Sequence, residues 1–236
     1  MKKSKLPIAL AGAVIVFLTG FVIGRLVVDG GSPFSFGRHA SPAGPRADSF
    51  LLPAFLTGMP DVRQSTGYTC GAAALQAVLA HWGISEREDR IAARLRTTPE
   101  HGTHPMDIVR GAAEFGLRAE LREGLGLADL EAGLKSGATI IVDLQAWRGN
   151  EEKPWTETWE DGHYMVLLGM DGRNLYFEDP SLLGSRGFIP RQEFLDRWHD
   201  YEGDPPPDAR DRKYVHMAIF IRGEKPVLWP PLQQVH

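Results

Sequence analysis

The chain has 236 residues, of which 43% are hydrophobic and 24% are charged, so it can form a packed globular core. Its formal net charge of −4 gives no electrostatic basis for binding nucleic acid. A single cysteine, Cys70, excludes an internal disulfide and a Cys-rich zinc site. That one thiol is either an inert core residue or a reactive group.

The N-terminal segment has the composition of a membrane anchor. Three lysines in residues 2–5 precede an uncharged run of 19 residues, Leu6 to Gly24, which as a helix spans roughly the 30 Å hydrocarbon core. No convincing cleavage site follows, so residues 1–28 are predicted to be a retained signal-anchor, with a cleaved signal peptide as the alternative. The lysines keep the N-terminus in the cytoplasm, which places the rest of the chain outside the inner membrane of a bacterium, in the periplasm or beyond.

The remainder reads as a linker followed by one domain. Residues 29–49 are rich in Gly, Pro and Ser and are predicted to be flexible, whereas residues 50–236 suit a single domain. Apolar periodicity predicts helices over residues 70–82, 85–95, 104–116, 127–137 and 191–200, and strands over 138–147, 163–172, 174–180 and 214–222. Ser85 and Glu88 form a capping-box pattern at the second helix. Helices precede most strands, which indicates an α+β domain with an antiparallel sheet.

Cys70 is predicted to occupy the first turn of a helix, which is a chemically significant position. Unpaired backbone N–H groups and the helix dipole favour negative charge there and so favour the thiolate. A cysteine nucleophile also needs a base, and the base needs an orienting acceptor. His163 begins one strand of the predicted hairpin and Asp179 ends the other, so both lie at one end of the sheet. Gln64, six residues before the cysteine, is a candidate donor to an oxyanion.

Three segments, in this order, resemble a known family. They are Q-x5-C-G-A-A-A-L from Gln64 to Leu75, LKSGATIIVDL, and GHYMVLLGMDGRNLYFEDPS, with GTHPMDIVRGAAEFGLRAE between the first two. They look like the bacteriocin-processing, double-glycine leader peptidases, family thirty-nine of the cysteine peptidases. The resemblance implies a papain-like fold, a peptide or protein substrate and no cofactor. It also implies that Cys70 is the nucleophile, His163 the base, Asp179 the orienting acid and Gln64 the oxyanion-hole residue.

The chain departs from that family at several points. Thr69 stands where the exporters usually have Asp, and neither transporter spans nor a nucleotide-binding module accompany the domain in this chain. The polar insert from Arg148 to Asp161 carries two tryptophans and is expected to form a rim over the site. Trp147, Trp155 and Trp159 either line a peptide groove or cover the sheet. The resemblance therefore supports the assignment of the catalytic residues better than it supports the substrate of the family.

Other interpretations remain open at this point. The same triad supports acyl transfer or amide hydrolysis on cell-wall peptides, and a domain of this fold can also bind a peptide without cutting it. A lone cysteine is commonly structural, a strand-edge histidine is commonly a satisfied core residue, and Asp before Pro is a common turn former. A metal cluster is also suggested by His81, His101, His104 and Asp107. It is the less favoured interpretation of these residues, because His101 and His104 lie in a loop beside Pro105.

Overall fold

The computed structural model describes residues 58–182, 184, 186–203 and 206–227. The chain separates into two units, Met1–Asp48 and Ser49–His236, and every described residue belongs to the second. The predicted anchor and linker therefore lie outside the described residues. Within the described part of the chain, no helix combines the length and apolar character needed to cross a membrane.

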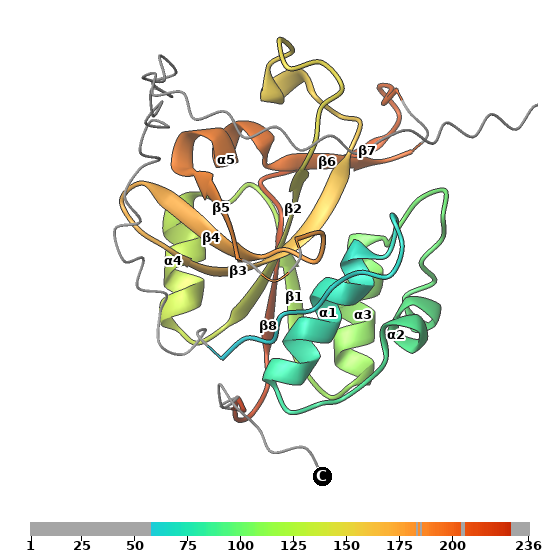
Figure 1. Cartoon of the computed structure of the whole chain (residues 1–236), viewed down its shortest axis with the longest axis vertical. Helices are drawn as coiled ribbons and strands as arrows, with labels where there is room; N and C mark the ends of the chain where they lie inside the picture. The colour runs from blue at the N-terminus through green and yellow to red at the C-terminus, as the bar shows by residue number, and fades with distance from the viewer. Residues whose placement is uncertain (1–57, 183, 185, 204–205, 228–236) are drawn as a thin grey trace, which may run out of the picture. The chain divides into compact units, whose positions relative to one another are not determined.

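The helices lie within the ranges that the sequence predicts, except that the last one, expected over residues 191–200, ends at Arg197, and His199 and Asp200 belong to a strand. The helices are α1 (Cys70–His81), α2 (Glu88–Arg94), α3 (Pro105–Glu114), α4 (Leu127–Lys135) and α5 (Arg191–Arg197), with a 3-10 turn η1 (Trp155–Glu157) (Figure 1). Glycines with positive φ follow α1, α3 and α4 and end them as expected. The capping box predicted at the start of α2 is wrong, because Arg87 and not Ser85 is the N-cap. The Glu88 carboxylate instead accepts a hydrogen bond from the backbone N–H of Ser65 at 3.0 Å.

An antiparallel sheet forms the centre of the domain. Its strands are β1 (Arg118–Arg122), β2 (Thr139–Gln145), β3 (Gly162–Met170), β4 (Asn174–Glu178), β5 (Gly187–Pro190) and β8 (Ala218–Arg222), in the order β1-β8-β2-β3-β4-β5. A separate ribbon pairs β6 (His199–Glu202) with β7 (Arg212–Val215). The hairpin of β3 and β4 is confirmed, with a register shift between Leu167 and Gly169.

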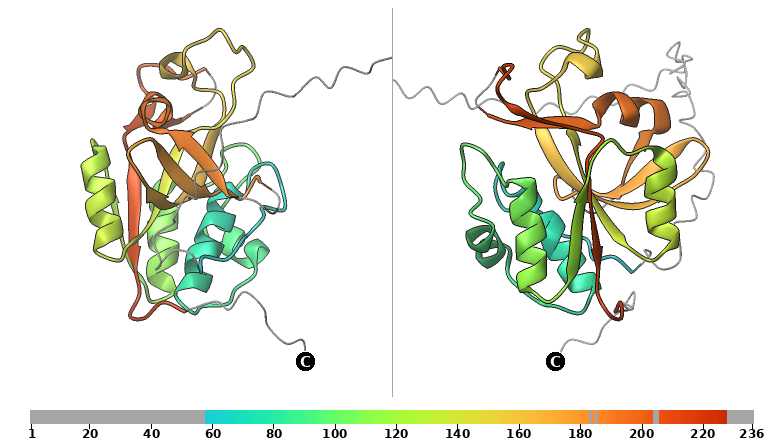
Figure 2. Two further views of the ribbon diagram at one scale, coloured as in Figure 1. Left: turned by 60° about the vertical axis from the view of Figure 1, so that its left-hand side comes forward. Right: turned by 180° about the vertical axis from the view of Figure 1, so that it is seen from behind.

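The helices pack on both faces of this sheet. Helices α1, α2 and α3 lie together on one side of β1 and β8, and α4 lies on the other (Figure 2). Helix α1 is almost wholly buried because its first turns carry small residues, Ala72, Ala73 and Ala74, that let it pack closely against β3. The domain therefore holds the N-terminus of α1 rigidly beside the start of β3.

The C-terminal part of the sheet differs from the sequence-based expectation. The strand predicted over residues 214–222 is divided into β7 and β8, because His216 adopts a positive φ of 53° between them. Strand β8 then inserts between β1 and β2. The strands β1, β5 and β6 were not predicted: β1 alternates charged with apolar residues on a half-exposed edge, and β5 and β6 are only four residues long.

Candidate active site

Cys70 is the first residue of α1, as predicted, and is 8% exposed. The residue after it must be small. A Cβ added at Gly71 would lie 2.8 Å from Thr103 Cβ and 3.1 Å from Tyr164 Cδ2, which is closer than packed carbons approach. The glycine therefore lets the loop before α3 and the strand β3 close around the start of the helix, and the thiol is held between them.

His163 and Asp179 meet at one end of the β3–β4 hairpin. His163 is the second residue of β3 and is 1% exposed, and Asp179 follows the last residue of β4. His163 Nε2 lies 2.7 Å from Asp179 Oδ1. Because this bond occupies Nε2, Nδ1 is the ring nitrogen left for the thiol of Cys70, with which the imidazole also interacts. The structure thus brings three of the four predicted site residues into one chain of contacts.

The electrostatics of these groups favour a charged imidazole. Burial, the largest single influence, would lower the pKa of His163, but the hydrogen bond with Asp179 and the interactions with Cys70 outweigh it and raise the pKa to about 9. Burial would likewise raise the pKa of Asp179, yet its contacts with His163 and Ser181 lower it. The pair is therefore suited to hold imidazolium beside carboxylate at neutral pH.

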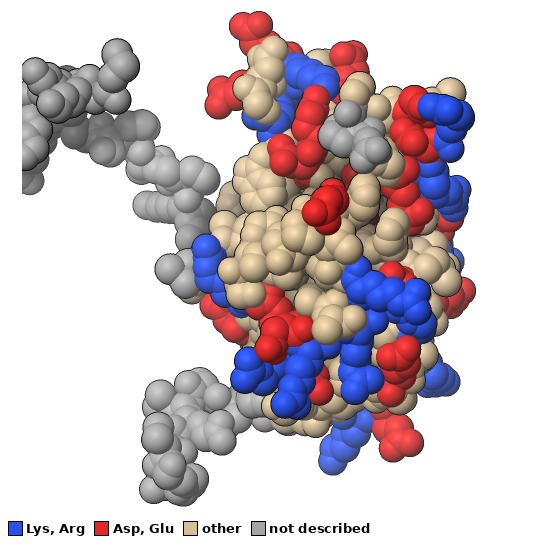
Figure 3. All heavy atoms as spheres, turned by 90° about the vertical axis from the view of Figure 1, so that its right-hand side faces the viewer, with Lys and Arg blue, Asp and Glu red and all other residues tan. Residues whose placement is uncertain are grey.

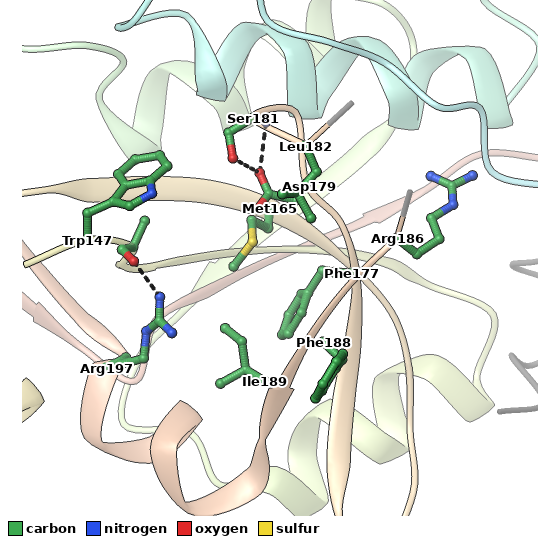
Figure 4. A pocket seen from close by; sticks show the side chains of 12 residues that line it. Trp147, Met165, Phe177, Asp179, Ser181, Leu182, Arg186, Phe188, Ile189 and Arg197 are labelled. Carbon is green, nitrogen blue, oxygen red and sulfur yellow. Dashed lines mark hydrogen bonds between the residues drawn. The ribbon is translucent and has the colours of Figure 1, made fainter. Parts of the chain in front are cut away.

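Ser181 contacts the candidate site and was not among the residues predicted from the sequence. Its backbone N–H and its hydroxyl donate to Asp179 Oδ1 at 2.8 and 2.7 Å (Figure 4). The same oxygen faces His163, so the turn after β4 fixes the direction of the carboxylate. A serine two residues after an aspartate is a common turn pattern, and that local signal was available in the sequence.

Gln64 lies beside this turn but its amide is partly engaged. Its backbone N–H donates to Pro180 O at 2.9 Å, which fixes the segment before α1 against the turn after β4. The side-chain Nε2 donates to Thr66 O at 2.7 Å, and Oε1 is buried without a hydrogen-bond partner among the described residues. An amide nitrogen carries two N–H groups, so one donor remains.

A groove of about 330 Å³ adjoins Asp179. Trp147, Phe177, Phe188 and Ile189 form its apolar walls (Figure 4). The Trp147 ring is 50% exposed and its centroid lies 5.0 Å from that of His163, so this tryptophan joins the groove to the triad.

The two tryptophans of the insert have other contacts. Trp155 packs under the guanidinium groups of Arg148 and Arg197, whose carbons lie 4.5 and 4.1 Å from the ring centroid. Trp159 packs against His199, at a centroid distance of 4.2 Å. Of the three tryptophans considered, Trp147 is therefore the one that lines the groove.

The histidines suggested for a metal do not converge. Over the residues that the structure describes, no group of three or more His, Cys, Asp or Glu side chains has the arrangement of a metal site. His104 Nδ1 lies 3.2 Å from Glu202 Oε1, and Asp107 pairs with Arg110. His81 is buried in α1, where desolvation lowers its pKa.

Comparison with known proteins assigns the chain to a family. A model described as the Peptidase C39-like family matches residues 57–205. An uncharacterized protein of Methanothermobacter marburgensis, an archaeal relative, is 29% identical over 133 residues, which are 56% of this chain and 80% of the relative.

Two solved structures share the fold. The peptidase domain of Streptococcus ComA, a bifunctional ABC transporter in quorum sensing, aligns at a TM-score of 0.50 and 19% identity, over 69% of this chain and 97% of that one. A Bacillus anthracis protein described as a putative C39-like peptidase aligns at a TM-score of 0.54 and 17% identity, over 72% of this chain and 96% of that one. The likenesses span archaea and bacteria, so they do not support a bacterial origin over an archaeal one.

Proposed function

The chain belongs to the Peptidase C39-like family, and we propose that it is a cysteine peptidase that hydrolyses peptide bonds through Cys70, His163 and Asp179. The contact of His163 Nε2 with Asp179 Oδ1, in a ring that also interacts with Cys70, is the observation that carries this proposal. Buried cysteines that serve only packing do not require an imidazole and a carboxylate aligned behind them.

The proposed reaction has two halves. The Cys70 thiolate attacks the carbonyl carbon of the scissile bond, and the resulting oxyanion accepts hydrogen bonds from the free N–H of Gln64 Nε2 and the Cys70 backbone N–H. His163 gives its Nδ1 proton to the leaving amine, which leaves a thioester on Cys70. The neutral imidazole then takes a proton from water, and the hydroxide attacks the thioester. Collapse of the intermediate releases the acid product and expels Cys70 as the thiolate, beside the imidazolium of His163 with which the cycle began. Asp179 and Ser181 hold the imidazole throughout.

The surroundings of the triad support a peptide substrate. The groove lined by Trp147, Phe177 and Phe188 adjoins Asp179 and offers apolar walls for side chains beside the scissile bond. Acidic and basic side chains alternate over the face drawn in Figure 3, so that face carries no single-sign field of the kind that attracts nucleic acid.

We also propose that residues 1–28 anchor the chain in a membrane and that the domain acts on the extracytoplasmic side.

Peptide turnover by the full chain tests the proposal. A peptide library derived from a proteome digest is incubated with the wild type and with Cys70→Ala, and new termini are identified by mass spectrometry. We expect new termini with the wild type alone, and equal thermal stability of the two proteins. A wild type that yields none, yet binds the same peptides, would point to a binding module. Products capped by an added amine instead of water would point to an acyl transferase.

A further inference from the structure

A second, smaller pocket of about 90 Å³ lies beside Cys70 and is lined by two carboxyl groups, one buried and one half-buried. Asp143, in the middle of β2, is 2% exposed, and Asp200, on β6, lies against the start of β3. A Cβ at Gly162 would meet Asp200 Oδ2 at 2.0 Å, so the glycine before His163 is what admits this carboxyl group. The two acids thus lie next to both Cys70 and the strand end that carries His163.

The carboxyl pair retains one proton and one negative charge. Asp143 and Asp200 hydrogen-bond to each other, which requires a proton between them. Burial, followed by the charge of Asp200 and that of Cys70, raises the pKa of Asp143 well above its ordinary value. Burial likewise raises the pKa of Asp200, to about 6.

One oxygen of this pair has no protein donor. Asp143 Oδ1 is buried without a hydrogen-bond partner among the described residues. The Tyr164 hydroxyl also interacts with the Asp143 carboxyl group, but it carries a single proton and donates it to Thr103 O at 3.0 Å. Gln145 Nε2 donates to Asp200 Oδ1 at 3.0 Å. A buried acceptor without a donor costs free energy, which a donor from a ligand recovers.

The other charged groups around the pocket leave it acidic. Glu202 at its rim is already bonded to Tyr214 Oη at 2.6 Å and to His104 Nδ1 at 3.2 Å. His101 also lines the rim, and within the described part of the chain no lysine or arginine does. A negative pocket with an unfilled acceptor and room for a few heavy atoms fits a cation that donates hydrogen bonds.

We infer that the pocket formed by Asp143 and Asp200 is a subsite for an ammonium or guanidinium group of the peptide that Cys70 attacks. This inference rests on the proposed function and names the substrate class: a peptide with a cationic group close to the scissile bond. The cation donates to Asp143 Oδ1, the shared proton is released to solvent, and both acids become carboxylates. Its positive charge beside Cys70 also stabilises the thiolate, which couples binding of the correct peptide to activation of the nucleophile.

The single cysteine allows a test without a known substrate. The full chain is treated with 2-aminoethyl methanethiosulfonate, which is cationic, and with neutral methyl methanethiosulfonate, and the two rates of Cys70 modification are compared. The ratio of rates is normalised to that of a small free thiol. We expect a normalised ratio of about 10 or more in the wild type. In Asp143→Asn, which leaves only the carboxylate of Asp200 for the cation, we expect a clearly lower ratio, whereas Asp89→Asn, an exposed site on α2, keeps the wild-type ratio.

Either a wild-type ratio near 1, or the same raised ratio in Asp143→Asn, would overturn the subsite. Asp200→Asn supplies a second variant where Asp143→Asn does not fold, and thermal stability is measured for each. The neutral reagent separates this result from the proposed function. If its rate against pH is that of an ordinary thiol and is indifferent to His163→Ala, the peptidase proposal fails, while the ratio of rates still reports on the pocket.

Discussion

His163 Nε2 lies 2.7 Å from Asp179 Oδ1, across the open end of the β3–β4 hairpin, and both donors of Ser181 converge on the same oxygen. The hairpin therefore does more than bring a base and an acid together. It fixes which ring nitrogen faces the carboxylate, and so leaves Nδ1 for Cys70. The chemistry of the site depends on this one contact, and the first predictions concern it.

Replacing Asp179 by Asn should reduce the pH range over which the site works. Without the carboxylate, part of what opposes burial is lost, so the pKa of His163 falls from about 9. Wild-type turnover should persist up to about pH 9 and then fall, as His163 loses the proton that it gives to the leaving amine. In Asp179→Asn the fall should come at lower pH, with turnover at neutral pH reduced about 100-fold or more. A profile that keeps its alkaline limit would show that Asp179 does not orient the base.

Folding stability should depend on pH through the same histidine. The pKa of His163 is about 9 in the folded protein and 6.5 in an unperturbed chain. A raised folded pKa gives stability that is fully present below pH 6.5 and is lost as pH rises through about 9. The difference corresponds to about 3 kcal/mol. Urea unfolding at pH 6 and pH 10 should therefore show a larger loss in the wild type than in His163→Ala. Equal losses would contradict the raised pKa.

Gln64 can be tested by comparing two reactions of the same thiol. Gln64→Ala should lower peptide turnover about 100-fold, because one donor to the oxyanion is lost. Alkylation of Cys70 by iodoacetamide forms no oxyanion, so its rate should stay within about twofold of the wild type. Gln76→Ala, whose amide donates to Glu86 O at 2.9 Å away from the site, is the matched control. A parallel loss of both reactions would assign Gln64 to loop structure instead.

Replacing Gly133 should destabilise the packing of α4 against the sheet. A Cβ there would lie 2.5 Å from Phe220 Cε1 and 2.9 Å from Ile140 Cδ1. Gly133→Ala should lower the free energy of unfolding by about 1–3 kcal/mol, despite the better helix propensity of alanine. Gly149→Ala, at a position with no atom within 4 Å, should be nearly neutral. Denaturant midpoints of the two variants make the comparison, and a neutral Gly133→Ala would show that α4 is not tightly packed.

The parts of the site that the sequence predicts are those fixed by local structure. The start of α1 follows from its apolar periodicity, and the hairpin follows from a turn between two apolar runs, so Cys70, His163 and Asp179 could all be placed beforehand. Ser181 could have been found from its position in the turn. The predicted N-cap at Ser85 fails because Glu88 is used by a tertiary contact to Ser65, which no local pattern encodes.

The acidic pocket depends on pairing that is distant in the sequence. Asp143 stands alone in an apolar strand, and a single acid in a buried run is itself a signal of function. Its partner Asp200 is 57 residues further along, on a short strand that local propensity does not reveal. The insertion of β8 between β1 and β2 is equally nonlocal. Such juxtapositions depend on the fold as a whole and not on any one segment.

The rate of Cys70 alkylation against pH tests the central claim most directly, because the full chain contains no other thiol. Iodoacetamide is applied from pH 4 to 10 to the wild type and to His163→Ala. An activated pair predicts a wild-type plateau that extends well below the free-thiol pKa of about 8.5, and its loss in the variant. A single ordinary titration near 8.5, identical in both proteins, would contradict the assignment of Cys70 and His163 as nucleophile and base.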